Sequence, residues 1–494
     1  METEELDTDP IAQSAARHAD KTAVVTPQDR LDYGTLDLLV DRAAAWIAGG
    51  VSQGERIAYL GRNGFELLVL ALGAERCGAI FVPLNWRLAA PEIGALIADC
   101  DPAITATQDE FHHLLSGRTA VLDALAEIRR TPAQTRPRLA AERPIILLYT
   151  SGTTGRPKGV IVTSANADAA ARNFRAVGEV SAASVTFSDL PMFHTIGLIA
   201  VARTTLMAGG TLVLADRFVP ERTLAVLSDP ALGITHYFAV PVMAQALLDA
   251  PGFDARILTR LHAIFVGGAP LATDLIERYL ECGLLLVNGY GLSEVGTAIH
   301  VPIDRDAVRR SAGTVGLPAP EIEVRLVRDG TDVPDGEVGE IWLRGPSVTP
   351  GYWRRPEETA AAFSDGWYRS GDLARRDPDG VYRIVDRLKD MYVSGGENVY
   401  PAEVETVLVG HPAVADAAVL GVPDSRWGEQ GVAFVALRPG TPFDPGALAA
   451  HCAARLGKYK CPARIVAIEA IPRSGAGKIL KSELRQRLKR GEFS

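Results

Sequence analysis

The sequence predicts an α/β protein of at least two domains, the larger of which is itself compound. Its 494 residues exceed what a single hydrophobic core usually holds. Hydrophobic residues make up 47% and charged residues 22% of the chain, values that are typical of folded globular proteins and not of disordered ones. In residues 1–140, short apolar segments alternate with segments of helical periodicity, which indicates strands and helices in turn.

One strand–helix–strand unit is clear in this region. RIAYL at 56–60 predicts a strand, 64–77 predicts a helix with an apolar face, and AIFVP at 79–83 predicts the next strand. Strands at this spacing form a parallel sheet with right-handed crossovers. The polar, Arg-rich segment 116–142 that follows is expected to be a surface connection.

Charge and cysteine content limit the function. The net charge of −9 argues against nucleic acid as a partner, because binding to a phosphate backbone needs a basic face. The five cysteines are odd in number, scattered and free of any CxxC pair, which fits reduced thiols in a cytosol. The acidic N-terminus and the lack of ~18 uninterrupted apolar residues predict neither a signal peptide nor a membrane span. We therefore expect a cytoplasmic protein, a monomer or homodimer, whose partners are small molecules.

A loop rich in glycine and hydroxyl groups predicts a phosphate site. The run YTSGTTGRPKGV at 149–160 follows the apolar segment PIILL at 144–148. Glycines let backbone N–H groups approach an anion, the Ser and Thr side chains add donors, and Lys158 adds a positive charge. The run is not a Walker A loop, because Gly152 and Gly155 are too close together and Gly159 follows Lys158.

The run resembles the phosphate-loop signature of the adenylate-forming enzymes, which include acyl-CoA synthetases, peptide-synthetase adenylation domains and luciferases. Four further segments resemble this family's motifs in the family's order, so that the resemblance covers nearly the whole chain. It implies that the loop holds the phosphates of ATP, with Thr150 and Lys158 also serving catalysis. The implied phosphate-binding residues are Thr150, Ser151, Gly152, Thr153, Thr154, Gly155 and Lys158.

The resemblance also implies a nucleotide pocket and a metal ligand. FVGGAP at 265–270 and NGYGLSE at 288–294 each follow an apolar run, and loops at the carboxyl ends of parallel strands form ligand crevices. Glu294 matches the family's Mg²⁺ ligand, which suits an ion that prefers oxygen donors. The residue before it is Ser293, where the family most often has Thr. The residues implied to contact the nucleotide are Gly268, Ala269, Pro270, Asn288, Gly289, Tyr290, Gly291 and Ser293, with Tyr290 stacked on adenine, Asp372 on the ribose hydroxyls and Arg387 on ribose and phosphate.

His194 stands between apolar residues in DLPMFHTIGL at 189–198. A single histidine in such a run is more often a satisfied core residue than a functional one. Its position after the phosphate loop resembles the family's carboxylate-pocket residue. The resemblance therefore implies that His194 gates the pocket or orients the carboxylate, without acting as an acid or base.

The family's order of motifs also implies a hinge at Lys389. The predicted domains are residues 1–388, which bind ATP and the acid, and residues 389–494, a small mobile α+β domain. Gly395 and Gly396, in the SGGEN stretch typical of acyl-CoA synthetases, would line the pantetheine tunnel. PRSGAGKIL at 472–480 also fails as a Walker A loop and matches the family's catalytic lysine loop, with Lys478 as the lysine.

The predicted function is therefore that of an ATP-dependent acyl-CoA synthetase that uses Mg²⁺ and coenzyme A. Intact motifs argue against a degraded binding or regulatory protein, and SGGEN argues against an enzyme that loads a carrier protein. One departure concerns the CoA 3′-phosphate: Cys461 and Ala463 stand where some relatives carry basic residues, so that Lys458 and Lys460 would serve instead.

The acyl pocket is expected at 237–241, Gly267 and Gly289, by resemblance, and these residues are mostly apolar or small. They favour an aromatic or medium-to-long aliphatic acid. A dicarboxylate is the alternative, with His236 or the stretch 309–311 as possible partners for its second carboxylate.

Overall fold

The computed structural model describes residues 9–115, 120–150, 157–394, 397–424, 427–473 and 477–493. By contact the chain forms two compact units, which are Met1–Glu323 with Leu343–Tyr368, and Val324–Trp342 with Arg369–Ser494. The predicted α/β class is confirmed. The predicted domain boundary at residue 388 stays a prediction, because a grouping by contact does not identify a hinge.

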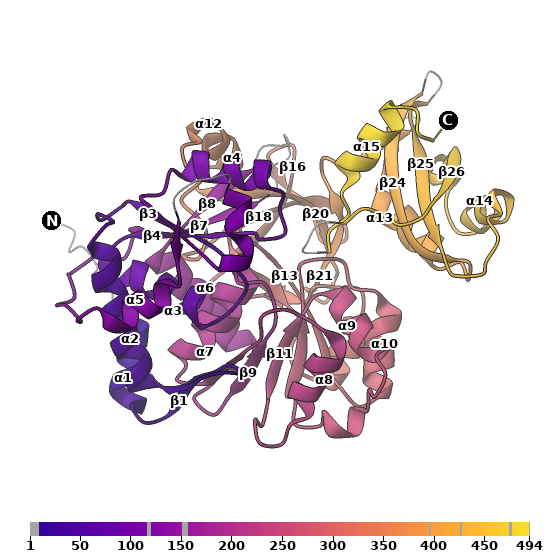
Figure 1. Ribbon diagram of the computed structural model, residues 1–494. Coiled ribbons are helices and arrows are strands. Elements are labelled where there is room, and N and C mark those ends of the chain that lie inside the picture. The colour runs from indigo at the N-terminus through magenta and orange to yellow at the C-terminus, as the bar shows by residue number, and fades with distance from the viewer. Residues whose placement is uncertain are drawn as a thin grey trace. The chain divides into compact units, whose positions relative to one another are not determined.

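The first unit contains a six-stranded sheet that is mostly parallel (Figure 1). Its strands, in spatial order, are β6 (Val121–Leu122), β5 (Ile104–Thr107), β3 (Arg56–Leu60), β4 (Ile80–Leu84), β7 (Pro144–Thr150) and β8 (Lys158–Thr163). All neighbours are parallel except the hairpin of β7 and β8, in which Thr150 pairs with Lys158. The predicted strand–helix–strand unit is present as β3, α3 (Phe65–Cys77) and β4.

The segment 116–142 differs from its prediction as a simple connection. Its residues 116–119 lie outside the described part of the chain, but β6 and α5 (Ala124–Arg130) follow. The Asp123 carboxylate caps the start of α5 by accepting from the N–H of Ala126, and Ala124 and Ile128 are buried. A short helix with only two buried side chains has too weak a periodicity to be predicted from sequence.

A nine-stranded sheet forms the other half of this unit. In spatial order it contains β15 (Leu317–Pro318), β14 (Gly296–His300), β13 (Leu286–Leu292), β12 (Ala263–Val266), β11 (His236–Ala239), β9 (Val185–Ser188), β10 (Thr211–Leu214), β1 (Thr22–Val25) and β2 (Arg30–Asp32). From β13 to β1 the neighbours are parallel, so that Ala239, Val266 and Asn288 lie in register on β11, β12 and β13. Figure 1 shows α8, α9 and α10 grouped beside these strands.

A buried ion-pair network holds three helices together in this unit. Arg203, at the end of the π-helix η2 (Ile196–Arg203), lies 2.7 Å from Glu75 of α3 and 2.6 Å from Asp168 of α6 (Ser164–Val177). Helix α6 follows β8 directly and starts with a capping box, because the Thr163 hydroxyl accepts from the Asn166 N–H and the Asn166 side chain from the Thr163 N–H. The network therefore fixes α6 and η2, which lie over the nine-stranded sheet.

The remaining helices of the first unit are α1 (Pro10–His18), α2 (Tyr33–Ala48), α4 (Ala90–Cys100), η1 (Asp109–Leu115), α7 (Thr204–Met207), α8 (Pro220–Ser228), α9 (Pro241–Leu248), η3 (Ala255–Ile257), α10 (Thr273–Glu281), α11 (Arg305–Arg310) and α12 (Pro356–Ala362).

A further six-stranded sheet has the order β17 (Thr331–Asp332), β16 (Glu323–Arg328), β18 (Val338–Arg344), β20 (Trp367–Arg376) and β19 (Phe363–Ser364), with β21 (Tyr382–Arg387) paired to β20.

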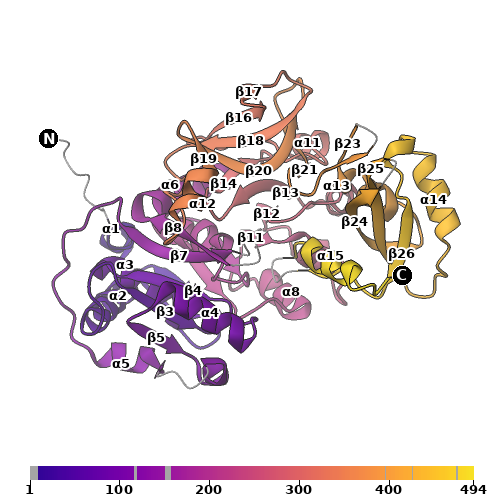
Figure 2. The same ribbon diagram turned by 90° about the horizontal axis from the view of Figure 1, so that it is seen from above.

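The C-terminal part of the second unit is a small α+β fold, as predicted. Its five-stranded sheet contains β23 (Glu397–Val399), β22 (Tyr392–Ser394), β25 (Gly428–Leu437), β24 (Val414–Asp424) and β26 (Arg464–Ile468). Alternate residues of β24 face two separate cores. The first core includes α13 (Pro401–Val409) and α14 (Pro445–Ala453), and the second includes α15 (Lys481–Lys489), so that helices cover both faces of the sheet (Figure 2). The short helix η4 (Lys458–Lys460) precedes β26.

Candidate active site

The carboxyl ends of β11 and β12 and the middle of β13 bring the predicted acyl and nucleotide segments together. Ala239 pairs with Val266, and Val266 pairs with Asn288, so that Gly267 and Gly289 lie side by side. A Cβ on Gly267 would be 3.3 Å from the carbonyl oxygen of Gly289 and 3.4 Å from the ring of Phe238. Because neither residue has a side chain, the backbones of Gly267 and Gly289 lie close together beside the Phe238 ring, and we call this pair the glycine floor.

The segment Asn288–Leu292 is a strand, although the sequence predicted that it leaves the sheet as a loop. Strand β13 continues to Leu292 because β14 supplies an antiparallel partner, in which Gly289 pairs with His300. A Cβ on Gly291 would be 2.2 Å from the carbonyl oxygen of Gly296, so this close pairing requires glycine. The hairpin turn then carries Ser293 and Glu294.

Glu294, the predicted metal ligand, is held by one side chain and one backbone N–H from a later part of the chain. Its Oε1 accepts a hydrogen bond from the Tyr352 hydroxyl at 3.0 Å, and its carbonyl oxygen accepts from the Thr349 N–H at 2.7 Å. Lys158 Nζ lies 5.2 Å from the centre of the Tyr352 ring. The structure thus brings Lys158 and Glu294 to the same residue. Burial and the Glu294 charge raise the pKa of Tyr352, which keeps its hydroxyl protonated as a donor.

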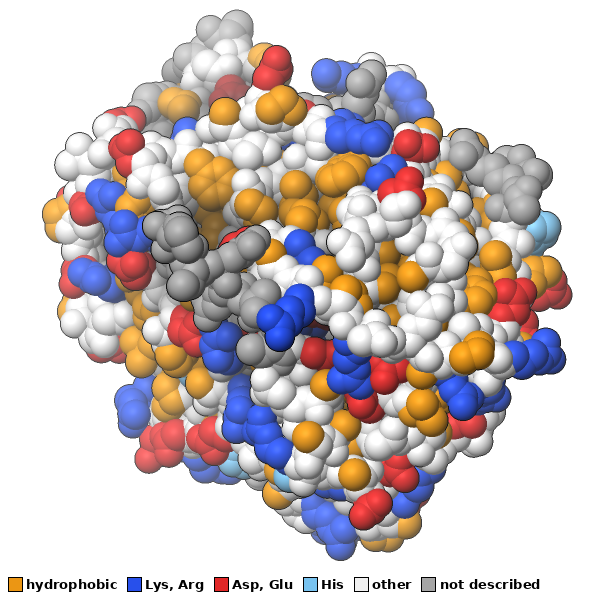
Figure 3. Space-filling model, turned by 90° about the vertical axis from the view of Figure 1, so that its left-hand side faces the viewer, with side chains coloured by type: hydrophobic (Ala, Val, Ile, Leu, Met, Phe, Trp, Pro, Cys, Tyr) orange, Lys and Arg blue, Asp and Glu red, His pale blue; other side chains and the backbone are white. Residues whose placement is uncertain are grey.

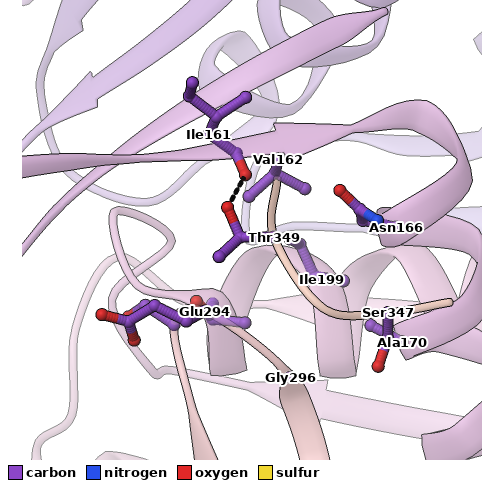
Figure 4. Close-up of a pocket in the computed structure, with 11 residues that line it drawn as sticks. Ile161, Val162, Asn166, Ala170, Ile199, Glu294, Gly296, Ser347 and Thr349 are labelled. Carbon is purple, nitrogen blue, oxygen red and sulfur yellow. Dashed lines mark hydrogen bonds between the residues drawn. The ribbon is translucent and has the colours of Figure 1, made fainter. Parts of the chain in front are cut away.

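A small pocket lies beside this turn (Figure 4). In Figure 4 the Glu294 carboxylate points away from Asn166 and Ser347, and the Thr349 hydroxyl donates to the Ile161 carbonyl oxygen at 2.6 Å. Its lining residues include Ile161, Val162, Asn166, Ala170, Thr195, Ile199, Ser293, Glu294, Gly296, Ser347 and Thr349. Segment 346–349 is tied to α6 because the Asn166 side chain donates to the carbonyl oxygens of Pro346 and Val348. The pocket therefore belongs to the surroundings of the predicted metal ligand.

The sequence did not single out Tyr352 or Thr349. Tyr352 follows a glycine and precedes a tryptophan in GYW at 351–353. A tyrosine in such a run is not distinguishable from a core aromatic by sequence alone. Its hydrogen bond to Glu294 spans 58 residues of chain, and no local pattern encodes that separation.

His194 is half-buried at the beginning of the helical segment that continues as η2. Its carbonyl oxygen accepts from the Leu198 N–H at 3.2 Å, and its ring centroid lies 4.6 Å from that of Phe193. The run 189–198, which contains His194, starts with the buried carboxylate of Asp189, a residue that the sequence did not single out. Asp189 accepts hydrogen bonds from Thr223 at 2.6 Å and Tyr237 at 3.2 Å, and burial raises its pKa to about 6.

The candidate partners for a second carboxylate do not face the predicted acyl pocket. His236 begins β11, at the opposite end of this strand from Ala239, and is buried. Both of its ring nitrogens are engaged, one with the Thr235 hydroxyl at 2.7 Å and the other with the Gly178 carbonyl oxygen at 3.0 Å. Arg309 and Arg310 are exposed at the end of α11.

In the second unit, Asp372 and Arg387 pair across β20 and β21, with 3.2 Å between Oδ1 and Nε. The structure therefore brings the two predicted ribose-binding residues together. Lys389 follows, and burial together with the charge of Arg387 lowers its pKa.

The base of the Lys478 loop is closed by backbone and side-chain contacts. Leu480 N–H donates to Pro472 O at 2.8 Å. The Arg473 guanidinium donates to Gly477 O at 2.6 Å and makes two bonds of 2.8 Å to the carboxylate of Asp416 on β24. Lys460 donates to both Glu403 oxygens at 2.7 Å, and this carboxylate raises the lysine's pKa against the effect of burial.

Several predicted site residues lie outside the described part of the chain. These are Ser151, Gly152, Thr153, Thr154 and Gly155 of the phosphate loop, and Gly395 and Gly396 of the expected pantetheine tunnel. The described ends of the phosphate loop, Thr150 and Lys158, are adjacent in the β7–β8 hairpin.

Comparison with known proteins identifies the family. The family described as AMP-binding enzyme matches residues 11–353, and the AMP-binding enzyme C-terminal domain matches residues 403–478. The chain belongs to the AMP-binding enzyme family. It is 39% identical over 477 residues to a feruloyl-CoA synthase of Amycolatopsis sp, covering 94% of this chain and 96% of that protein. An indoleacetate–CoA ligase of Aromatoleum aromaticum is 35% identical over 503 residues, covering 98% of both chains.

A solved structure also resembles nearly the whole chain. ATP-bound MatB from Rhodopseudomonas palustris superposes with a TM-score of 0.91 at 28% identity, covering 97% of this chain and 99% of that chain. The predicted class is confirmed: the chain is an AMP-forming acid–thiol ligase of the acyl-CoA synthetase type, with ATP, Mg²⁺ and coenzyme A as cofactors and cosubstrates. Among the described residues, no helix is long and apolar enough to cross a membrane.

Proposed function

We propose that this AMP-binding enzyme activates an aromatic monocarboxylic acid and transfers its acyl group to coenzyme A. The observation that carries this choice of acid is the glycine floor, in which the adjacent backbones of Gly267 and Gly289 lie beside the ring of Phe238. A planar ring gains contact on such a floor, whereas a flexible aliphatic chain must first be ordered. The names of two similar proteins, which refer to feruloyl and indoleacetate groups, support the same class.

The residues suit a reaction that needs positioning and charge neutralisation. The carboxylate of the acid attacks the α-phosphorus of ATP and pyrophosphate leaves, after which the CoA thiol attacks the acyl carbon and AMP leaves. Lys158, Thr150 and the hydroxyls and backbone of 151–155 would bind the β- and γ-phosphates. Glu294 would hold Mg²⁺, which neutralises phosphate charge when bound. The Glu294 carboxylate, whose Oε1 accepts a hydrogen bond from Tyr352, suits a metal that prefers oxygen ligands.

The remaining assignments complete the site. Tyr290, Asn288, Ser293, Gly291 and the segment 268–270 would surround the nucleotide base, and the Asp372–Arg387 pair would bind ribose and phosphate. His194 would orient the acid, and Lys478 would meet the negative charge that gathers between carboxylate and α-phosphate. Lys460, with Gly395 and Gly396, would serve CoA, although its ion pair with Glu403 must then open.

A dicarboxylic acid fits less well. His236 has both ring nitrogens engaged at the far end of β11, and Arg309 and Arg310 face solvent. A second carboxylate on the glycine floor would lack a cationic partner from either predicted source, and an unpaired buried charge is costly.

We also propose that the protein works in the cytoplasm as a monomer or homodimer. All five cysteines are free, which suits a reducing compartment. On the face that Figure 3 shows, basic and acidic side chains are intermixed and form no single basic area. This distribution supports small molecules as partners.

The experiment that tests the function measures AMP release with a panel of aromatic, aliphatic and dicarboxylic acids. ATP–pyrophosphate exchange without CoA reports the first step, and thioester formation with CoA reports the second. We expect both with aromatic monocarboxylates and the highest kcat/KM in that group. Highest activity with aliphatic acids or dicarboxylates would overturn the choice of acid, and acyl transfer to a carrier protein but not to CoA would favour carrier loading.

A further inference from the structure

His300 lies at one end of the glycine floor. It pairs with Gly289 across β13 and β14, and a Cβ on Gly289 would be 3.9 Å from the Cβ of His300. Directly opposed residues of an antiparallel pair point to the same face of a sheet. Gly267, Gly289 and His300 therefore follow one another across three neighbouring strands.

The same face is covered by α6 and η2. Phe174 of α6 packs against Phe238 and Phe265, which share this face with Gly267, and its ring centroid lies 5.7 and 5.3 Å from theirs. At the other end of the row, a Cβ on Gly268 would be 3.5 Å from a side-chain methyl of Ile196, the first residue of η2. His194, which is proposed to orient the carboxylate, lies two residues before Ile196. An acid held between these layers has its carboxylate near the start of η2 and its distal end toward β14.

The hydrogen bonding of His300 fixes the chemical character of its ring. Nδ1 lies 2.9 Å from the carbonyl oxygen of Val301, and a carbonyl oxygen can only accept, so Nδ1 carries the proton. Burial lowers the pKa of His300, which keeps the ring neutral at pH 7. Nε2 is then a hydrogen-bond acceptor, and it has no partner among the residues that the structure describes.

We propose that Nε2 of His300 accepts a hydrogen bond from a hydroxyl on the distal end of the acyl group, and that the enzyme therefore selects hydroxylated aromatic acids. This assignment rests on the proposed placement of the acid over Gly267 and Gly289. A hydroxyl is the matching group because it donates, whereas a methoxy or carboxylate oxygen would face the lone pair of Nε2 with another acceptor. An acid without the hydroxyl leaves Nε2 without a hydrogen bond once water is displaced, which costs binding energy.

The test compares kcat/KM for matched acids that differ in one ring hydroxyl, such as 4-hydroxycinnamate, 3-hydroxycinnamate and cinnamate. We expect the wild-type enzyme to prefer one hydroxylated isomer over cinnamate roughly tenfold, the size of one hydrogen bond to a neutral partner. His300→Phe removes the acceptor and should abolish this preference while retaining activity with cinnamate. His300→Gln keeps an acceptor oxygen and should retain part of it.

The control is His262→Phe, which changes an exposed histidine paired with Glu179 on the surface. It should leave the preference as in the wild type. Equal kcat/KM for all three acids in the wild type, or an unchanged preference in His300→Phe, would overturn the role of His300. Inactivity of the wild type with every aromatic acid, together with activity on aliphatic acids, would instead overturn the proposed function, so the two failures are distinguishable.

Discussion

The hydroxyl of Tyr352 donates a hydrogen bond to Oε1 of Glu294 at 3.0 Å, while the ring of the same tyrosine lies 5.2 Å from Nζ of Lys158. One aromatic side chain thus orients the carboxylate that would bind the metal and contacts the lysine that would bind the phosphates. Glu294 Oε2 makes no hydrogen bond to any residue in the described ranges. That oxygen would therefore be the one available to the proposed Mg²⁺.

Replacing Glu294 by Gln should raise the Mg²⁺ concentration required for activity. The change keeps the shape of the side chain but removes the negative charge that attracts the ion. Adenylation rates measured over a Mg²⁺ titration should fall and recover in part at high Mg²⁺. The matched variant Tyr352→Phe, which loosens the carboxylate without removing its charge, should shift the titration less. The same Mg²⁺ dependence in Glu294→Gln and wild type would indicate a structural role.

Lys478→Ala should abolish adenylate formation and spare the transfer of a supplied acyl-adenylate to CoA. Removing a positive group that contacts only the first transition state typically costs ~10²–10³-fold. ATP–pyrophosphate exchange measures the first step, and thioester formation from synthetic acyl-adenylate measures the second. Lys489→Ala, at the exposed end of α15, serves as the control. Near wild-type exchange in Lys478→Ala would exclude the proposed role.

Arg473→Gln should reduce adenylation by about tenfold, while transfer from acyl-adenylate stays near wild type. Arg473 joins Asp416 to Gly477, the residue before Lys478, through charge-assisted bonds. Its loss should loosen the loop without removing the lysine. Arg473→Lys keeps one charged bond to Asp416 and should recover part of the rate. Equal loss in both half-reactions would point to instability of the whole unit instead.

Lys389→Pro should impair one half-reaction, the thioester step, and leave adenylation largely intact. The family resemblance implies a hinge at Lys389. A rotation is expected because Lys478 and Gly395–Gly396 both fall in the predicted C-terminal domain, and one rigid placement would not serve both steps. Proline fixes φ and restricts the preceding residue, which would block a hinge rotation. Lys389→Ala changes the side chain alone and serves as the control. Equal effects on both steps, or none, would contradict the hinge assignment.

Asp189 should make stability depend on pH. Its folded-state pKa of about 6 exceeds the ordinary value of 3.8, so folding favours the protonated form. The resulting stabilisation is complete below about pH 4 and is lost as pH rises to about 6, a change of at most about 3 kcal/mol. Asp189→Asn removes this titration. The free energy of unfolding, measured in urea between pH 4 and 8, should rise in the variant relative to the wild type as the pH increases to about 6. A difference in unfolding free energy that does not change with pH would refute the assignment.

The sequence predicted the elements with strong periodicity and the residues within short motifs. The predicted β3–α3–β4 unit is present. The structure also brings Asp372 to Arg387 and places both Lys158 and Glu294 at Tyr352, while the roles assigned to these residues stay predictions. The contacts it did not find join residues far apart in the chain. Tyr352 reaches Glu294, and the Asp189 carboxylate reaches Thr223 and Tyr237, only after the sheets and helices have packed. His300 was not recognised because its importance depends on register opposite a glycine.

The five free thiols differ sharply in accessibility, and this difference provides a way to observe movement. Cys77, Cys100 and Cys452 are buried, and burial raises the pKa of Cys100 to about 12 and that of Cys452 to about 11. Cys282, in the first unit, is exposed, and Cys461, in the second, is half-buried with a raised pKa. Because the thiolate is the reactive form, a maleimide dye should modify Cys282 first and a second dye Cys461 afterwards. The native chain thus offers one fluorophore position in each unit, and energy transfer between them would test for the proposed domain movement during turnover without any introduced cysteine.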